Sequence, residues 1–242
     1  MVISHAKKFV VFAPWKSASS TTQSRLAEHN ESPYHWFYDF NPFLQRVVHQ
    51  HLTLADFTGL PESKLGYFLA SFVRNPYDRV YSGFLQIQRD IQEQPTAFFP
   101  TPWVKTQVQR QLEANLAQLV KADFEFNNWV LSLQEHQIYE IGHNSSFPMH
   151  PAHYWTHLAG TQLVNFVGKV ECFETDFAAL CSTLGITEPE KVNHNLSETP
   201  THRGPSQSGY RYLQLMNPAS VDKINQLFKE DFELFGYEMA RP

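Results

Sequence analysis

Three runs of apolar residues stand out along this chain because polar residues do not alternate with them. They cover residues 8–13, 67–73 and 163–170, and they are rich in β-branched and aromatic side chains. This pattern is typical of strands that are buried on both faces, as in a parallel sheet covered by helices. We therefore expect an α/β fold of three layers, with a central parallel β-sheet flanked by helices.

Helical signals occur between and after these runs. We expect helices over residues 20–29, 53–57, 76–92, 103–120, 123–136, 175–185 and 217–228. Thr53, Asn75, Asp123 and Asn217 stand where a side chain caps the start of a helix. Gly185 stands where a helix ends, because glycine tolerates the left-handed backbone conformation. These helices are expected to cover the sheet and to build a helical insert at about 95–136.

The remaining segments carry other signals. Residues 31–43 are dense in aromatic side chains and broken by two prolines, so we expect an irregular loop near the site. We expect residues 47–51 to be extended and residues 193–207 to form a polar loop. The Phe-rich segment near the C-terminus is expected to pack on the core.

Length and composition narrow the class of protein. The 242 residues are expected to form a single domain over 1–242, with a helical insert at about 95–136. A formal net charge of −5 gives no general attraction to nucleic acid or to an anionic membrane. Cys172 and Cys181 make no disulfide framework, and no apolar run is long enough to span a bilayer. We therefore expect a cytoplasmic protein with no membrane span.

The first apolar run leads directly into a loop of small, hydroxyl-bearing residues with one lysine. The loop consists of Lys16, Ser17, Ala18, Ser19, Ser20 and Thr21. A strand, a loop and then a helix direct several backbone N–H groups at one point, which favours phosphate binding. The Lys16 ammonium is placed to stabilise charge on a leaving phosphate oxygen. No glycine lies between Ala13 and Arg25, so the loop is P-loop-like but lacks the pattern G-x-x-x-x-G-K-[ST].

A second basic site follows the middle apolar run. Arg74 comes directly after that run, and Ser82 lies about two turns into the helix that we expect next. A guanidinium fork together with a hydroxyl suits a terminal phosphate monoester. We interpret Arg79 of the same helix as a member of an ordinary ion pair with Asp78 or a neighbouring residue.

Both basic sites resemble segments of sulfotransferases that use 3'-phosphoadenosine 5'-phosphosulfate (PAPS). Residues 16–21 resemble the loop that binds the 5'-phosphosulfate in that family, and residues 74–82 resemble the segment that binds the 3'-phosphate. Residues 167–171 and 231–237 also look like the carbohydrate sulfotransferase branch. Trp15 departs from the family, which usually runs proline directly into lysine. Its indole either stacks on the adenine or packs against the sheet edge.

The two histidines of His49-Gln50-His51 are the candidates for acid–base chemistry. In an extended backbone, residues two apart lie on the same face, so both imidazoles can point into one cleft. The segment resembles the His-x-His of uronyl 2-O-sulfotransferases, in which the second histidine is the general base. The resemblance assigns that role to His51 and leaves His49 to orient His51 or the acceptor. An unperturbed pKa of about 6.5 suits a histidine to accept a hydroxyl proton near neutrality.

The resemblance implies an enzyme that transfers a sulfuryl group from PAPS to an acceptor hydroxyl. The product would be adenosine 3',5'-bisphosphate (PAP), and no metal is expected. The acceptor would be a small molecule or glycan, that is, a sugar, glycolipid or other alcohol. A neutral acceptor is favoured by an aromatic group, namely Tyr34, Trp36, Phe37 and Tyr38. Two other classes stay open, a P-loop small-molecule kinase and a noncatalytic nucleotide-binding module.

Two more groups of residues carry a possible ligand chemistry. His150, His153 and His157 follow one another at steps of three and four, a spacing that on a helix suits zinc. Prolines in this segment disfavour a regular helix, so we interpret the three as surface or acceptor-groove histidines. In the late polar loop, the residues that suit a cover over the nucleotide are Arg203, Gly204 and Arg211.

Overall fold

The computed structural model describes residues 1–34, 38–93, 102–139, 149–189 and 212–241. The chain divides into two compact units. The first unit comprises Met1–His35, Asn41–Arg74 and Tyr154–Gly204, and the second comprises Trp36–Phe40, Asn75–His153 and Pro205–Pro242. The organisation as one domain with an insert stays a prediction.

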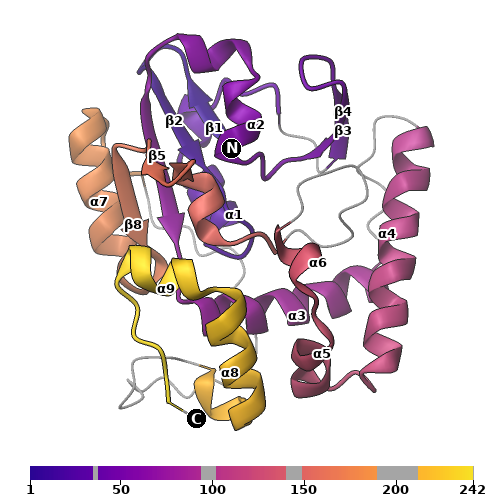
Figure 1. Ribbon diagram of the computed structural model, residues 1–242. Coiled ribbons are helices and arrows are strands. Elements are labelled where there is room, and N and C mark those ends of the chain that lie inside the picture. Colours follow the sequence, from indigo (N-terminus) through magenta and orange to yellow (C-terminus); the bar gives the residue numbers. More distant parts are fainter. Residues whose placement is uncertain (35–37, 94–101, 140–148, 190–211, 242) are drawn as a thin grey trace. The chain divides into compact units, whose positions relative to one another are not determined.

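The first unit is built on a four-stranded sheet in the order β1-β2-β5-β8 (Figure 1). The strands are β1 (Val2–Ser4), β2 (Phe9–Phe12), β5 (Phe68–Val73) and β8 (Phe166–Lys169). β2, β5 and β8 run parallel, whereas β1 pairs antiparallel with β2. The three predicted core strands are therefore confirmed with slightly shorter bounds. The edge strand β1 was not predicted, because three residues are too few to show a pattern.

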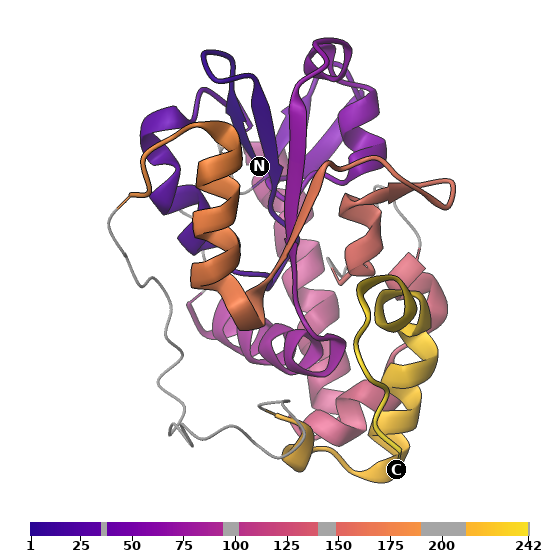
Figure 2. The ribbon, with the colours of Figure 1, turned by 90° about the vertical axis from the view of Figure 1, so that its left-hand side faces the viewer.

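Alternate side chains of these strands enter two apolar clusters, one on each face of the sheet. One cluster joins Phe9 and Phe72 to Phe177 of helix α7 (Phe173–Leu184), which Figure 2 shows lying across that face. The other joins Val10 and Phe12 to the short helix α2 (Leu54–Thr58). Strand geometry explains this division, because successive side chains point to opposite faces. The α/β fold with a central, mostly parallel sheet flanked by helices is confirmed.

Local capping signals fix the helix ends of the first unit. Thr53 accepts a hydrogen bond from Asp56 N, and Asp56 accepts one from Thr53 N, which makes the capping box that begins α2. α7 ends at Gly185, whose φ of 61° is left-handed, as predicted. The helix expected over 20–29 is α1 (Ser19–Arg25) followed by the 3₁₀ turn η1 (Ala27–His29). α7 begins two residues before the predicted Thr175.

The segment expected to be an irregular loop contains a strand, so that prediction was wrong in part. β3 (Tyr38–Asn41) crosses the boundary between the units, and β4 (Arg46–His49) follows it. Asn41 Oδ1 accepts hydrogen bonds from Phe43 N and Leu44 N. Pro42, which follows Asn41, therefore lies in a turn and breaks no strand. The extended backbone predicted over 47–51 holds through His49. Shorter elements of this unit are η2 (Pro61–Lys64), η5 (Val170–Cys172), β6 (His157–Leu158) and β7 (Thr161–Gln162).

The second unit is helical within the residues that the structure describes. Its helices are α3 (Pro76–Glu93), α4 (Pro102–Lys121), α5 (Phe126–Ser132), α6 (Glu135–Tyr139), α8 (Pro218–Leu227) and α9 (Lys229–Phe235), with the turn η6 (Leu213–Leu215). The turn η4 (Ala152–Trp155) crosses into the first unit. The packed neighbours within the second unit include α3 with α4 and α8, α5 with α4 and α8, and α8 with α9.

Two predicted caps of the second unit are confirmed and one was wrong. Asn75 Oδ1 accepts from Tyr77 N at 2.9 Å, and Asn217 Oδ1 accepts from Ser220 N at 2.8 Å. Asp123 caps no helix: its φ of 53° and that of Phe124 (56°) are left-handed where α4 ends. The chain therefore turns there, and α5 starts three residues later, with Glu125 as its N-cap residue.

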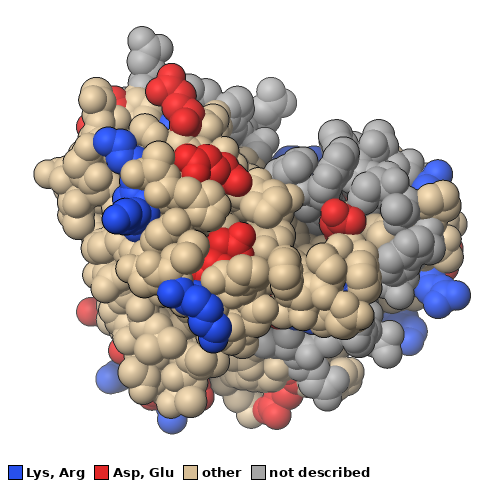
Figure 3. Space-filling model, turned by 90° about the horizontal axis from the view of Figure 1, so that it is seen from above, with Lys and Arg blue, Asp and Glu red and all other residues tan. Residues whose placement is uncertain are grey.

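The surface of the described residues mixes charges of both signs. Seen from above, Lys and Arg side chains lie interspersed with Asp and Glu (Figure 3). Such a face has no extended field of one sign that would attract a polyanion. In the described part of the chain, no helix combines the length and the apolar character that a membrane span requires.

Candidate active site

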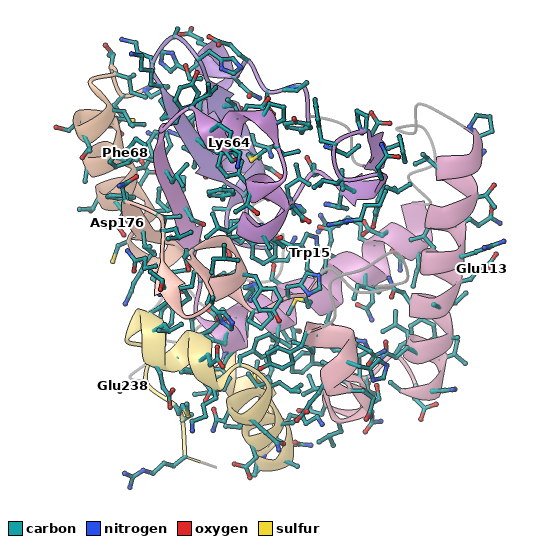
Figure 4. The ribbon with its side chains drawn as sticks, turned by 45° about the horizontal axis from the view of Figure 1, so that its top comes forward. Trp15, Lys64, Phe68, Glu113, Asp176 and Glu238 are labelled. Carbon is teal, nitrogen blue, oxygen red and sulfur yellow. The ribbon has the colours of Figure 1, made fainter. Side chains whose placement is uncertain are left out.

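The loop after β2 contains the first residues of the candidate site. It leaves the sheet at the edge where the parallel strands end, opposite the edge where Phe68 begins β5 (Figure 4 labels Phe68 and Trp15). Lys16 and Ala18 both have left-handed backbone, with φ of 63° and 56°. Ser17 N donates to Pro14 O at 3.1 Å, and Thr22 N donates to Ala18 O at 2.9 Å. The loop thus reaches a tight turn without glycine, at a cost of about 1–2 kcal/mol for each left-handed residue.

Two features of this loop are compatible with a bound ligand. Ser17 is 1% exposed, and its hydroxyl has no hydrogen-bond partner among the described residues. A buried hydroxyl without a partner is uncommon in proteins and requires an explanation. Ala18, the N-cap residue of α1, has no side-chain acceptor for the first N–H groups of the helix. An anion bound in the loop would satisfy both groups of donors.

Arg74 joins the second basic segment to this loop. β2 and β5 are adjacent parallel strands, so the residues that follow them lie at the same edge of the sheet. Arg74 Nη1 donates to Lys16 O at 3.4 Å. The structure therefore brings together Lys16 and Arg74, which are 58 residues apart in sequence. Ser82, the predicted partner of Arg74, lies half-buried in α3 of the second unit, so its place relative to Arg74 stays a prediction.

His51 lies against the start of the same loop. The His51 side chain is buried, and its Nδ1–H donates to the carbonyl oxygen of Ala13. His51 N donates to His49 Nδ1 at 3.2 Å, and the two rings stack with centroids 4.6 Å apart and an interplanar angle of 14°. A carbonyl oxygen only accepts, so His51 Nδ1 carries a proton and Nε2 of the neutral ring keeps a lone pair.

The surroundings hold both imidazoles neutral. Burial lowers the pKa of His51 well below 6.5, and the neighbouring His49 and the Lys16 ammonium lower it further. Burial also lowers the pKa of His49. A neutral His51 near neutral pH has a free acceptor nitrogen, as a general base requires.

A comparison with family models decides the class of the protein. The model described as the sulfotransferase family matches residues 1–238, which is nearly the whole chain. The chain belongs to the sulfotransferase family. Membership makes it a PAPS-dependent sulfotransferase, and the resemblance seen in the phosphate loop is confirmed at the level of the family. Neither the curated proteins nor the solved structures include a significant match to the chain.

Other residues of this sulfotransferase that were predicted near the site either pack inside the protein or lie outside the described residues. Trp15 is 5% exposed, so of its two proposed roles the burial supports packing inside the protein. Tyr34 donates its hydroxyl to Glu62 Oε2 at 3.1 Å and packs on the apolar cluster beside α2. Tyr38 lies in β3. Trp36 and Phe37, and the later group Arg203, Gly204 and Arg211, lie outside the described residues.

The three spaced histidines contact different partners. In the second unit, His150 Nδ1 donates to Ile138 O at 2.8 Å, and the two nitrogens of His153 contact Asp231 and Glu230. His157 belongs to the first unit, where Nδ1 pairs with Thr156 Oγ1 at 2.8 Å. No group of three possible metal ligands occurs among the described residues.

Arg79 forms an ion pair, as we interpreted, but its partner is not Asp78 or a neighbouring residue. Its Nη1 contacts Asp231 Oδ2 at 3.4 Å, and both side chains are buried. Asp78 instead accepts a hydrogen bond from Tyr212 N at 2.9 Å. The ion pair between Arg79 and Asp231 joins positions 152 apart, which no local sequence signal reveals.

The sequence also gave no sign of the group that orients His51. The acceptor is the backbone carbonyl of Ala13, and every residue has such a group. Only the fold brings this carbonyl to a histidine 38 positions away.

Proposed function

We propose that this sulfotransferase transfers the sulfuryl group of PAPS to an uncharged acceptor hydroxyl, with His51 as general base. The observation that carries the proposal is the hydrogen bond from His51 Nδ1–H to Ala13 O. It fixes the tautomer that leaves Nε2 free to accept, and it holds the ring at Ala13, three residues before the phosphate loop begins at Lys16. The likeness to uronyl 2-O-sulfotransferases, which share the His-x-His arrangement, belongs to this proposal.

The loop of residues 16–21 is proposed to hold the 5'-phosphosulfate. The buried, unpartnered hydroxyl of Ser17 supports this role, since a phosphate or sulfate oxygen would accept its proton. The Lys16 ammonium would neutralise charge on the bridging oxygen as it leaves. Arg74 is proposed to bind the 3'-phosphate together with Ser82, because a guanidinium forms paired, charge-assisted hydrogen bonds with a phosphate.

The chemical step follows from these positions. The acceptor oxygen attacks sulfur in line with the bridging oxygen, and His51 Nε2 takes the hydroxyl proton. A new S–O bond forms, the bond from sulfur to the bridging oxygen breaks, and PAP departs with that oxygen's electron pair. His49, stacked on His51 and accepting from its backbone N–H, keeps the base in place.

The acceptor is proposed to be a neutral sugar, glycolipid or other alcohol. Arg46 is the single Lys or Arg in the sequence from 38 to 51, and its guanidinium forms an ion pair with Asp56. Phe40 and Phe43 of this segment are 39% and 56% exposed. Exposed aromatic rings suit the apolar face of an uncharged acceptor, and the ion pair leaves Arg46 with a counterion of its own. Tight and steeply salt-dependent binding of acidic oligosaccharides would contradict this proposal.

A His51→Asn variant tests the mechanism, because the asparagine amide can still donate to Ala13 O. We expect kcat for sulfate transfer to fall about 10²–10⁴-fold, the usual contribution of a general base. Binding of PAP, measured by calorimetry, should change by less than about twofold, since a base contributes little to nucleotide affinity. The control is His136→Asn, on an exposed position of α6, which should behave as the parent.

The same assay separates the alternatives. Mass spectrometry over an acceptor panel detects the sulfated product. Turnover that survives EDTA and requires PAPS, with none when ATP replaces it, excludes a magnesium-dependent kinase. Full transfer by His51→Asn would refute the proposed base. PAP binding without transfer by the parent to any acceptor would identify a noncatalytic module instead.

A further inference from the structure

The helix that follows the phosphate loop ends at a buried arginine. Arg25 is 3% exposed and is the last residue of α1. Its Nη1 contacts Glu174 Oε2 at 3.1 Å, and its Nη2 contacts Glu188 Oε1 at 2.8 Å and Pro189 O at 3.3 Å. The guanidinium carbon also lies 4.0 Å from the centre of the Phe177 ring.

This residue is too far from the loop to bind the nucleotide itself. At 1.5 Å per residue, Arg25 lies about 9 Å along the helix from Ser19, where α1 begins. Its charge is already opposed by two carboxylates on the α7 side of the sheet. Arg25 therefore does not contact the phosphate directly. It can act on the loop only through helix α1.

The short helix needs such an anchor. α1 has seven residues, and a helix of two turns is not stable by its own hydrogen bonds. Its first residue follows a left-handed N-cap that provides no side-chain hydrogen bond. At its other end, Arg25 binds Glu174 of α7 and lies over Phe177 of the same helix, while Leu26 enters the apolar cluster beside α7. These contacts oppose both sliding and rotation of α1.

We propose that Arg25 is a positioning residue for the 5'-phosphosulfate. It fixes α1 against α7, and so holds the N–H groups and hydroxyls of residues 16–21 in the geometry that binds the donor. The inference rests on the proposed function, because it takes this loop as the site of the phosphosulfate. Arginine suits the position since its planar fork reaches two carboxylates while its face lies on an aromatic ring.

Calorimetric titration with PAP, well below the melting temperature of every variant, tests the inference. Arg25→Met keeps the length and apolar contact of the side chain but loses the fork. We expect its Kd for PAP to rise about tenfold to a hundredfold, the usual consequence of misplacing a binding group by about 1 Å. Arg25→Lys keeps the charge without the fork and should give an intermediate Kd.

A matched destabilised variant separates positioning from loss of stability. Val164→Ala removes apolar contact from the cluster on the opposite face of the sheet. Its melting temperature should fall, yet its Kd for PAP should stay within about twofold of the parent. If Arg25→Met does not fold, Glu188→Gln replaces it, since this variant weakens one of the two ion pairs and should raise the Kd by a smaller factor.

The outcomes distinguish this inference from the function on which it rests. If Lys16→Ala weakens PAP binding and the Arg25 variants bind as the parent does, the inference is overturned and the proposed function stands. If Lys16→Ala and Arg74→Ala both bind PAP as the parent does, the loop is not the donor site and the proposed function fails. Equal loss of affinity in Val164→Ala and Arg25→Met would also overturn the inference.

Discussion

At the scale of single residues, the proposed chemistry depends on which nitrogen of His51 carries a proton. Ala13 O fixes that proton on Nδ1, and burial keeps the ring neutral. The same burial has a thermodynamic consequence, because a histidine that stays neutral in the folded protein gains a proton more readily when the chain unfolds.

Stability should therefore fall as the pH is lowered through about 6.5, where the unfolded imidazoles take up protons. The folded pKa values of His49 and His51 are both lowered, so the folded state binds fewer protons in this range. Each histidine should lower the free energy of unfolding by up to about 1.4 kcal/mol per pH unit below 6.5. Urea unfolding between roughly pH 7 and pH 5 measures this slope.

The double variant His49→Asn/His51→Asn provides the control for the pH series. Its unfolding free energy should depend less steeply on pH than that of the parent, because two titrating groups are gone. Equal slopes in both proteins would show that other groups cause the dependence.

Arg74 should contribute mainly to nucleotide affinity. Loss of a charge-assisted hydrogen bond costs about 1.5–3 kcal/mol. Arg74→Ala should therefore raise the Kd for PAP about 10–100-fold, and thermal-shift titration with PAP should show less stabilisation than for the parent. Arg110→Ala, on an exposed position of α4, is the charge-matched control. The same thermal shift in parent and Arg74→Ala would remove Arg74 from the 3'-phosphate site.

At the scale of elements, the sheet brings the site together. β2 and β5 are neighbours in the sheet, and their ends deliver the loop and Arg74 to the same edge. Close packing keeps the strands in place: a Cβ added at Gly168 of β8 would come within 2.7 Å of Phe72 Cδ1, on the neighbouring strand. Phe72 is held in turn by Phe173 and Phe177 of α7.

Gly168→Ala should destabilise the protein by about 1–3 kcal/mol, because the added methyl group meets a ring that cannot move aside. Chemical unfolding measures the change in free energy. Phe72→Leu alone will also be destabilising, since it removes part of a buried ring. The double variant should lose less unfolding free energy than the sum of the losses in the two single variants. Strict additivity would show that the methyl group and the ring do not meet.

How much the sequence predicted differs from one element to another. The core strands and α3 have strong local signals, an apolar run for each strand and Asn75 with Pro76 for the helix, and their positions were predicted to within a few residues. β3 and the end of α4 have weak signals, because Asn41 allows a proline-containing turn and Asp123 adopts left-handed backbone. The partners of Arg25 and Arg79 are distant in sequence, so only the fold reveals them.

The residues of the candidate site also differ in how far the sequence predicted them. Lys16 was singled out in the loop after one strand and Arg74 directly after another, and the parallel pairing of those strands brings both residues to the same edge. The orientation of His51 was not predictable, since it depends on the Ala13 carbonyl. The pairing of Arg74 with Ser82 stays a prediction, as does the acceptor.

At the scale of the whole chain, buried polar contacts connect segments that are far apart in sequence. In the second unit, Asp231 of α9 accepts hydrogen bonds from Ala152 N at 2.6 Å and from His153 N at 3.0 Å. The same carboxylate faces the Arg79 guanidinium of α3. One carboxylate thus joins α3, α9 and the segment that begins η4.

Asp231→Asn should lower the free energy of unfolding by about 3–5 kcal/mol, because it removes one charge of the buried ion pair with Arg79. Urea unfolding of the purified variant measures this loss. The neighbouring Glu230 has a side chain that is 63% exposed, so Glu230→Gln is the matched control and should change stability by less than about 0.5 kcal/mol. Equal effects of the two substitutions would show that the ion pair contributes no more than a surface contact.

The left-handed backbone at Lys16 and Ala18 has a consequence for the energetics of donor capture. Residues with a Cβ sample fewer backbone states than glycine does, so a loop without glycine has less conformational freedom to lose when a ligand arrives. The donor would enter a cradle that is already shaped, and the unfavourable entropy of ordering would be small. Ala18→Gly would reverse this balance: the strain would be relieved, and the cradle would have to be ordered anew at each turnover.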